Sequence, residues 1–280
     1  MQAPRMPTRF STLVLAALLA CAPCSGFAQA KPKAAPSDPL SDPFMKSAGF
    51  LSGHPDLRYR LLGLEEFRKG HLTDAFRFFQ RAAYYADKPS QGMVAEMLWN
   101  GQGVAQDKAL GYAWMDLAAE RGYITFLGQR ERYWNTLDDA QRSRAIDEGQ
   151  AIYAKYGDAA AQPRIATVLR RARMQVTGSR TGFAGSLKIY VPGPGGFEQI
   201  DGSKFYDPKY WDPKQYQAWH DAVWMSPRIG HVSVGTMEKV REDAPAGVPS
   251  RVPTAQPQTD SEEPETPDRD ESGLGTRPVP

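Results

Sequence analysis

The sequence predicts a mainly α-helical protein: a short α-solenoid of antiparallel helix hairpins with a small aromatic-rich, irregular or β-containing C-terminal appendage. Apolar residues recur three and four positions apart between residues 57 and 83, the spacing of one buried helix face. The pattern returns after 36 residues, as in stacked helical units. Beyond residue 175 apolar residues alternate instead and turn-forming residues accumulate, which favours short strands and loops.

Composition narrows the class of protein. The 280 residues carry 34 Lys and Arg against 32 Asp and Glu, a formal net charge of +2, and 41% of them are hydrophobic. That is enough apolar material for one core but too polar for a polytopic membrane protein. The small positive excess excludes no partner by itself, although it does not resemble the dense basic stripe of a nucleic-acid binder. We expect no nucleic-acid partner because of the export signal described next.

Residues 1–30 predict a secretory signal peptide. Two arginines precede an apolar run from Leu13 to Ala22, and Ala28-Gln29-Ala30 forms a small-x-small cleavage site. The alternative is an N-terminal helix of the fold, which the Lys/Pro/Ala-rich residues 31–39 disfavour. We therefore expect an exported protein, periplasmic or secreted, that begins at Lys31.

Both cysteines, Cys21 and Cys24, lie inside the signal segment. Cleavage leaves no thiol, which excludes disulfides, thiolate catalysis and cysteine metal sites in the mature chain. Leu18-Leu19-Ala20-Cys21 also resembles a bacterial lipobox, so a lipid anchor at Cys21 is the alternative. The small-x-small site fits an ordinary signal peptide better, which makes the lipoprotein the less favoured reading.

A helical repeat domain with capping helices is expected over residues 44–174, after an extended lead over residues 31–43. The first two helices carry their apolar faces at 57–67 and 76–83. Gly70 between them suits a helix C-terminus with positive φ. The short connection makes the two helices pack antiparallel.

A second helix pair is expected at about 90–100 and 107–121, separated by Gly101-Gln102-Gly103 and closed by Gly122. Sliding the chain by 36 residues matches this pair to the first. The matched positions are Ala75 with Gly111, Phe78 with Trp114, Phe79 with Met115, and Ala82-Ala83 with Ala118-Ala119. Paired alanines let neighbouring helices approach closely, so these residues are predicted to be structural.

At these residues the chain resembles the Sel-like repeat family, relatives of the tetratricopeptide repeat, as an exported bacterial member. The second unit carries Asn100-Gly101-Gln102-Gly103-Val104, Gln106-Asp107, Gly111, Trp114, Ala118-Ala119 and Gly122. The first unit carries Leu62-Gly63, Gly70, Ala75, Phe79 and Ala82, with Glu66 in place of the usual tyrosine. The resemblance covers residues 57–122 and implies a non-enzymatic scaffold or adaptor for a peptide or protein partner.

Two or fewer stacked units are seldom stable, so residues 123–174 are expected to cap them. Thr136 with Asp139 predicts a capping box that opens a helix ending at Gly157. A last helix is expected over 162–174, with Ile165, Val168, Leu169 and Ala172 buried.

Residues 175–240 predict the appendage. Apolar and polar residues alternate around Leu187, Ile189 and Val191, and again around Val232 and Val234, which favours short strands. Asp212-Pro213 predicts the start of a helix. Residues 241–280 hold eight prolines and nine acidic against four basic side chains. This composition predicts a disordered, acidic, Pro-rich tail.

No catalytic residue, cofactor or metal site is expected. The four histidines share no metal-ligand spacing, and no serine lies in a Gly-x-Ser-x-Gly elbow. A basic last helix could contact an anionic surface, although a solvated capping face is the favoured reading. Its arginines are Arg164, Arg170, Arg171 and Arg173.

Seven aromatic residues crowd residues 205–224, namely Phe205, Tyr206, Tyr210, Trp211, Tyr216, Trp219 and Trp224. With nearby aspartates they could form a site that binds or processes cell-wall glycan, which is the alternative function. The favoured reading is that the rings build the core of the appendage, because an irregular segment needs large side chains to be ordered.

An unidentified envelope or secreted protein is the expected partner. In tetratricopeptide-type hairpins the first helix of each unit lines the concave face, and the resemblance transfers that geometry to two segments. The candidate partner-binding residues are Arg60, Leu64, Phe67, Arg68, Glu96, Trp99 and Asn100. Aromatic rings flanked by arginines are typical of a binding hot spot, although Phe67 and Trp99 could equally be inter-repeat core.

Overall fold

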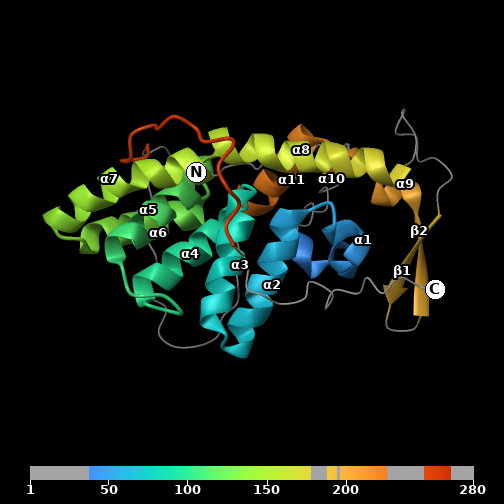
Figure 1. Cartoon of the computed structure of the whole chain (residues 1–280), viewed down its shortest axis with the longest axis horizontal. Coiled ribbons are helices and arrows are strands. Elements are labelled where there is room, and N and C mark those ends of the chain that lie inside the picture. Colours follow the sequence, from blue (N-terminus) through green and yellow to red (C-terminus); the bar gives the residue numbers. More distant parts are fainter. Residues whose placement is uncertain (1–37, 178–187, 194–195, 226–248, 266–280) are drawn as a thin grey trace, which may run out of the picture. The chain divides into compact units, whose positions relative to one another are not determined.

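The computed structural model describes residues 38–177, 188–193, 196–225 and 249–265, and this part of the chain is mainly helical, as the sequence predicts (Figure 1). The helices before residue 122 are α1 (Ala48–Leu51), α2 (Pro55–Lys69), α3 (Leu72–Tyr84), α4 (Lys88–Asn100) and α5 (Lys108–Ala118), with 3₁₀ helices η1 (Pro39–Ser41), η2 (Pro43–Lys46) and η3 (Ala119–Arg121). The later helices are α6 (Ile124–Thr136), α7 (Asp139–Tyr156), α8 (Asp158–Thr177), α9 (Gly202–Phe205), α10 (Pro208–Trp211) and α11 (Pro213–Met225). The strands are β1 (Lys188–Gly193) and β2 (Gly196–Asp201), which pair antiparallel.

Several sequence predictions concern residues outside the described ranges. These are the signal peptide at 1–30, the lipobox at Cys21, the strand at Val232 and Val234, and the ends of the tail at 241–248 and 266–280. In the described part, none of the helices has the length and apolar character needed to cross a membrane.

Helix α2 packs against α3, and α4 packs against α5, each pair joined by a short connection. The predicted turn glycines Gly70, Gly101, Gly103 and Gly122 all have positive φ. At Gly103 a Cβ atom would lie only 2.3 Å from the backbone carbon of Leu72, because the Gly-x-Gly loop rests on the start of α3. A side chain at Gly103 would therefore strain the backbone and push the two helix pairs apart.

The central core lies around α5, which packs against α4, α6 and α7. The structural positions matched by the repeat are buried in both units, namely Ala75, Phe79, Ala82, Ala83, Trp114, Ala118 and Ala119. At Gly111 a Cβ atom would lie 3.1 Å from the backbone nitrogen of Trp99. The lack of a side chain thus lets α4 and α5 approach closely.

The capping region differs from the prediction at its start. The capping box is made by Asp138 and Gln141, whose side chains each accept from the other residue's backbone N–H, at 2.8 and 3.1 Å. The Thr136 hydroxyl donates instead to the Arg132 carbonyl, because Thr136 still belongs to α6. Asp shares the N-cap preference of Thr, so the pattern of residue types alone placed the box two residues early.

The lead is not extended where the structure describes it, and it packs against residues 205–211 of the appendage. Residues 38–51 form η1, η2 and α1, started by the side chains of Asp38 and Asp42. Rings from both segments interlock: Phe44 packs edge-on against Phe205, with centroids 5.5 Å apart. The shared cluster of buried residues is Leu40, Phe44, Met45, Phe50, Leu51, Leu57, Phe205, Tyr206, Tyr210 and Trp211.

Part of the predicted disordered tail is ordered. Residues 249–265, which we call the strap, run as an extended segment over α7 toward α3, drawn in red in Figure 1. Its backbone meets the helices, since the Gln258 amide donates to the Ala154 carbonyl at 2.6 Å. Disorder was expected because this segment has too few apolar residues to form a core. The strap is ordered without one, because it binds polar groups that the helices present.

Candidate functional site

The predicted partner-binding surface is contradicted at Arg60. The Arg60 side chain is 2% exposed and lies 3.3 Å from a carboxylate oxygen of Asp38 and 3.3 Å from one of Asp87. A buried arginine needs carboxylate partners, and the lead and the start of α4 provide them. Arg60 is therefore a structural residue and is not available to a partner.

The other six residues of that surface fall into two groups. Leu64, Phe67 and Trp99 are half-buried against the central core, whereas Arg68, Glu96 and Asn100 are exposed. The Trp99 ring stacks on Tyr133 with centroids 3.7 Å apart, and its other neighbour is the Lys108 ammonium, 5.5 Å from the ring centre. Trp99 thus serves the packing of α4 on α6, and none of the seven predicted residues lines the cavity described below.

A different surface holds an extended chain segment. We call it the strap groove; it consists of the α3, α5, α6, α7 and α8 residues that the strap contacts, chiefly Arg81, Tyr84, Asp116, Glu131, Gly149, Tyr153, Ala154 and Arg164. The strap crosses it with three sets of contacts, taken in turn below, and with an ion pair from Glu263 to Arg81 at its far end.

The first set is made by Arg251. Its guanidinium forms two hydrogen bonds to the Glu131 carboxylate, at 2.9 and 2.6 Å, and lies 4.7 Å from the centre of the Trp134 ring. These hydrogen bonds hold the pKa of Glu131 below its usual value. A planar guanidinium paired with a carboxylate through two hydrogen bonds and packed against a ring is a geometry that lysine does not reproduce.

The second set is made by Ser250 and Val252. Val252 is 5% exposed, and it fits because Gly149 lacks a side chain: a Cβ atom there would lie 2.8 Å from a Val252 methyl. The Ser250 hydroxyl donates to the buried carboxylate of Asp116, which also accepts from the Tyr153 hydroxyl at 3.0 Å. Burial raises the pKa of Asp116, although the bond from Ser250 lowers it in part.

The third set holds the strap backbone. Arg164 donates to the carbonyls of Gln258 and Thr259, the latter at 3.2 Å, and the Tyr84 hydroxyl donates to the carbonyl of Ser261. Hydrogen bonds of this kind bind the backbone of an extended segment, so they form with many different side-chain sequences.

The predicted basic face of the last helix needs correction at Arg164. The sequence favoured a solvated capping face, but the Arg164 guanidinium is buried, 3.9 Å from the centre of the Tyr84 ring. Arg170 and Arg171 are exposed, as a solvated face requires. At the far end of the strap Glu263 pairs with Arg81 on α3 at 2.6 Å.

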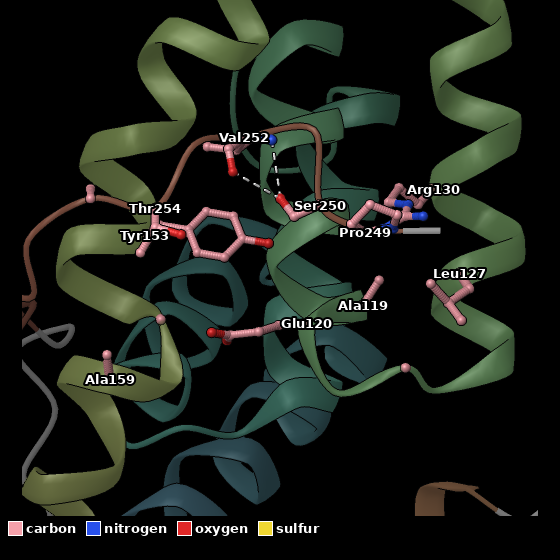
Figure 2. A pocket seen from close by; sticks show the side chains of 13 residues that line it. Ala119, Glu120, Leu127, Arg130, Tyr153, Ala159, Pro249, Ser250, Val252 and Thr254 are labelled. Atoms are coloured by element: carbon pink, nitrogen blue, oxygen red, sulfur yellow. Dashed lines mark hydrogen bonds between the residues drawn. The ribbon is translucent and has the colours of Figure 1, made fainter. Parts of the chain in front are cut away.

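A cavity of about 380 Å³ lies beside the strap. Figure 2 shows the strap residues Ser250, Val252 and Thr254 along its edge, with Tyr153 and Glu120 beneath them. The full lining is Ala119, Glu120, Gly122, Leu127, Arg130, Tyr153, Gly157, Ala159, Pro249, Ser250, Val252, Thr254 and Ala255. The lining mixes small and apolar residues with the polar or charged side chains of Glu120, Arg130, Tyr153, Ser250 and Thr254.

The polar floor of the cavity is held by hydrogen bonds and ion pairs. Glu120 accepts from the Lys88 ammonium at 2.5 Å and from the backbone amide of Asp158 at 3.0 Å. Burial alone would raise the pKa of Asp158, but the charges of Lys88 and Arg121 outweigh it and hold the pKa at about 2. These charges have their partners within the protein, so none of them depends on a ligand for a counter-charge.

The aromatic segment 205–224 packs inward. Phe205, Tyr206, Tyr210, Trp211 and Tyr216 are buried, and Trp219 and Trp224 are half-buried. The nearby aspartates have structural partners, since Asp201, Asp207 and Asp212 accept from backbone amides at helix starts and Asp221 accepts from Tyr123. The rings thus offer little free face to a sugar.

A buried polar cluster joins α11 to α2. The Tyr216 hydroxyl donates to Asp56 at 2.7 Å, and His220 lies 4.0 Å from the same carboxylate, with Arg60 and Asp87 beside them. Burial and the charge of Asp87 raise the pKa of Asp56 to about 7. None of these five residues lines the cavity, and the bond from Tyr216 to Asp56 joins α11 to α2.

Within the described residues, no three His, Cys, Asp or Glu side chains gather in a way that would hold a metal ion. No protein-family model matches this chain, and neither a curated protein nor a solved structure is detectably similar to it. What the chain does is therefore inferred from the geometry of its own groove.

The sequence reasoning missed the strap and the residues that hold it. The available signal was Ser250-Arg251-Val252, a hydroxyl, a guanidinium and a β-branched side chain between prolines in an otherwise acidic tail. Gly149 in the middle of α7 was a second signal, because a glycine inside a helix marks a close approach.

Proposed function

We propose that this chain is a non-enzymatic interaction protein that binds an extended peptide in the strap groove. One observation carries the proposal: a segment of the chain itself lies there as a peptide ligand would, held by its side chains and by its backbone. Contacts to the backbone give affinity, while Glu131, Asp116 and the space beside Gly149 select the residues that enter.

We further propose that α2–α5 are two Sel-like units of a short α-solenoid, capped by α6–α8. Turn glycines with positive φ and buried alanines at matched positions support this. If the units are equivalent, Ala82→Leu and Ala118→Leu should each lower the free energy of unfolding by about 1 to 3 kcal/mol, because both methyl groups are buried at close helix contacts. Urea denaturation measures both; a loss at one site alone contradicts the equivalence.

Export remains part of the proposal and rests on the N-terminal sequence. Intact mass of the protein from its native host should correspond to a chain that starts at Lys31. A lipidated start at Cys21 would replace the soluble form with an anchored one.

Glycan binding by residues 205–224 is the weaker proposal, because most of its rings are buried in the core shared with the lead. It needs a rearrangement of that core, whereas peptide binding needs only the strap to leave.

The test of peptide binding opens the groove and offers the strap sequence from outside. The receptor is the full chain with Arg251→Glu, which places like charge against Glu131 and releases its own strap. A labelled synthetic peptide of residues 248–264 should bind this receptor with a measurable Kd by fluorescence anisotropy.

Two controls accompany this test. Wild-type protein, whose groove is filled, should bind the peptide far more weakly than the receptor does, and a peptide carrying Arg251→Glu should not bind the receptor. If the native peptide fails to bind the opened receptor up to millimolar concentration, the strap groove is not a peptide site.

A further inference from the structure

The strap fills its groove incompletely. It covers a cavity of about 380 Å³ with the small residues Ser250, Thr254 and Ala255. The cavity is partly open to solvent, and where the strap lies over it the small side chains of the strap make fewer dispersion contacts than larger ones would. Of the strap residues that line the cavity, Val252 is buried against Gly149, whereas Thr254 is exposed and Ala255 is half-buried.

The strap is also tethered. Twenty-three residues separate Met225 at the end of α11 from Pro249. Because the strap belongs to the same chain, its binding to the groove is intramolecular, and a free peptide competes with a local concentration rather than with a bulk one. A segment held this way stays in place with weak contacts, and a free peptide of the same sequence would displace it only at comparable concentration.

The loose fit and the tether together indicate how an outside ligand competes. A ligand that keeps the anchoring contacts and also fills the cavity gains affinity that the strap lacks. The apolar walls that would receive its side chain are formed by Leu127, Ala119 and Ala159, and polar side chains such as Glu120 and Arg130 line the rest of the cavity. A large apolar side chain suits these walls.

We propose that the strap is a replaceable internal occupant of the groove, and that the partner is an extended peptide of the pattern Ser/Thr-Arg-Val/Ile-x-x-Φ, where Φ is a large apolar residue. The proposal rests on the proposed function. The first three positions correspond to Ser250, Arg251 and Val252, and Φ corresponds to Ala255, which lines the cavity and is half-buried. The partner thus displaces the strap because it fills the space that Ala255 leaves empty.

The test uses the full chain with Arg251→Glu as receptor and three labelled peptides of residues 248–264: the native sequence, Ala255→Phe, and Gln256→Phe. Gln256 is exposed and does not line the cavity, so it is the matched control for added hydrophobicity. We expect the Ala255→Phe peptide to bind about tenfold more tightly than the native one, and the Gln256→Phe peptide to bind like the native one.

A second receptor locates the gain. Ala159 is exposed in the first turn of α8 and lines the cavity, so Ala159→Phe fills it from the protein side without entering the core. In the receptor with both Arg251→Glu and Ala159→Phe the native peptide should bind as before, and the advantage of Ala255→Phe should disappear.

The outcomes separate the two claims. If the native peptide binds and Ala255→Phe binds no more tightly, or if Gln256→Phe gains as much, the proposed motif is overturned while peptide binding stands. If the gain persists in the receptor with Ala159→Phe, the extra affinity does not come from the cavity and the motif is overturned as well. If no peptide binds, the proposed function fails and the motif with it.

Discussion

Two segments after α8 dock on the helices by opposite means. Residues 202–225 bury their rings, and Trp211 is only 1% exposed, inside the cluster shared with the lead. The strap buries one large apolar side chain, Val252, and otherwise holds on through ion pairs and backbone hydrogen bonds.

This difference has a functional consequence. Removing rings from a shared core costs stability for the whole fold, whereas a polar strap can leave while the helices keep their packing. The aromatic segment is therefore a permanent part of the molecule, and the strap is the exchangeable one. The predictions below test this contrast, beginning with the largest effect.

Trp211→Ala should lower the free energy of unfolding by about 3 to 5 kcal/mol, because it empties a space that the surrounding rings cannot close. It also removes the Trp211 Nε1–H bond to the Phe205 carbonyl, at 2.6 Å. Urea denaturation measures the loss, with the exposed Lys214→Ala on α11 as control. A loss below about 1 kcal/mol would show that the aromatic segment is as dispensable as the strap.

Asp56→Asn should stabilise the protein at high pH and have little effect at low pH. The folded state raises the pKa of Asp56 from 3.8 to about 7, so the folded protein binds the extra proton and wild-type stability falls as the pH rises between these values. The free energy of unfolding of the variant should exceed that of wild type by almost nothing at about pH 4. This difference should grow to at most about 4 kcal/mol at pH 8.

The comparison with the variant is needed because His54 acts in the opposite sense. Its folded pKa of about 4 lies below 6.5, so His54 makes wild-type stability rise with pH between these values. The difference between the two proteins cancels this contribution. A difference that does not vary with pH would place the Asp56 carboxyl in a solvated site.

Gly149→Leu should expel the strap and leave the helices folded. The added side chain would occupy the place of Val252. Even a Cβ atom added at Gly149 would lie only 2.8 Å from a Val252 methyl carbon. Limited proteolysis should cut within residues 249–265 in the variant and not in wild type, while the free energy of unfolding changes by no more than about 1 kcal/mol. Global unfolding of the variant would contradict the view that the strap leaves alone.

The smallest effects separate the arginines of α8. Arg171→Ala should change neither stability, beyond about 0.5 kcal/mol, nor proteolysis of the strap, because Arg171 is exposed. Arg164→Ala should expose the strap to protease, because Arg164 donates to its backbone. Equal behaviour of the two variants would mean that the contacts of Arg164 do not hold the strap.

The sequence predicted the parts of the molecule that local rules decide. Helix-period apolar residues predicted α2–α5, glycines predicted the turns with positive φ, and Asp212-Pro213 predicted the start of α11, where Asp212 accepts from Lys214 at 3.1 Å. These features depend on a few neighbouring residues, so their patterns are visible in one sequence.

The contacts between distant segments could not be predicted in the same way. Arg60 was assigned to a partner because the residues near it do not reveal that Asp38 and Asp87 close around it. Composition predicted disorder for the strap because it counts apolar residues and does not register the partners Glu131 and Asp116. The resemblance to helical repeats favoured a binding surface, but the structure places the occupied groove on other residues.

The most direct measurement is hydrogen exchange at the Gln258 amide in the full chain, with Gly149→Leu for comparison. This amide donates to Ala154 on α7, so it should be protected in wild type at pH 7. In the variant it should exchange like an amide of a free peptide, while the amides of α4 and α5 keep their protection. Exchange at the free-peptide rate in wild type, or protection lost from α4 and α5 together with Gln258, would contradict an exchangeable strap seated in a folded groove.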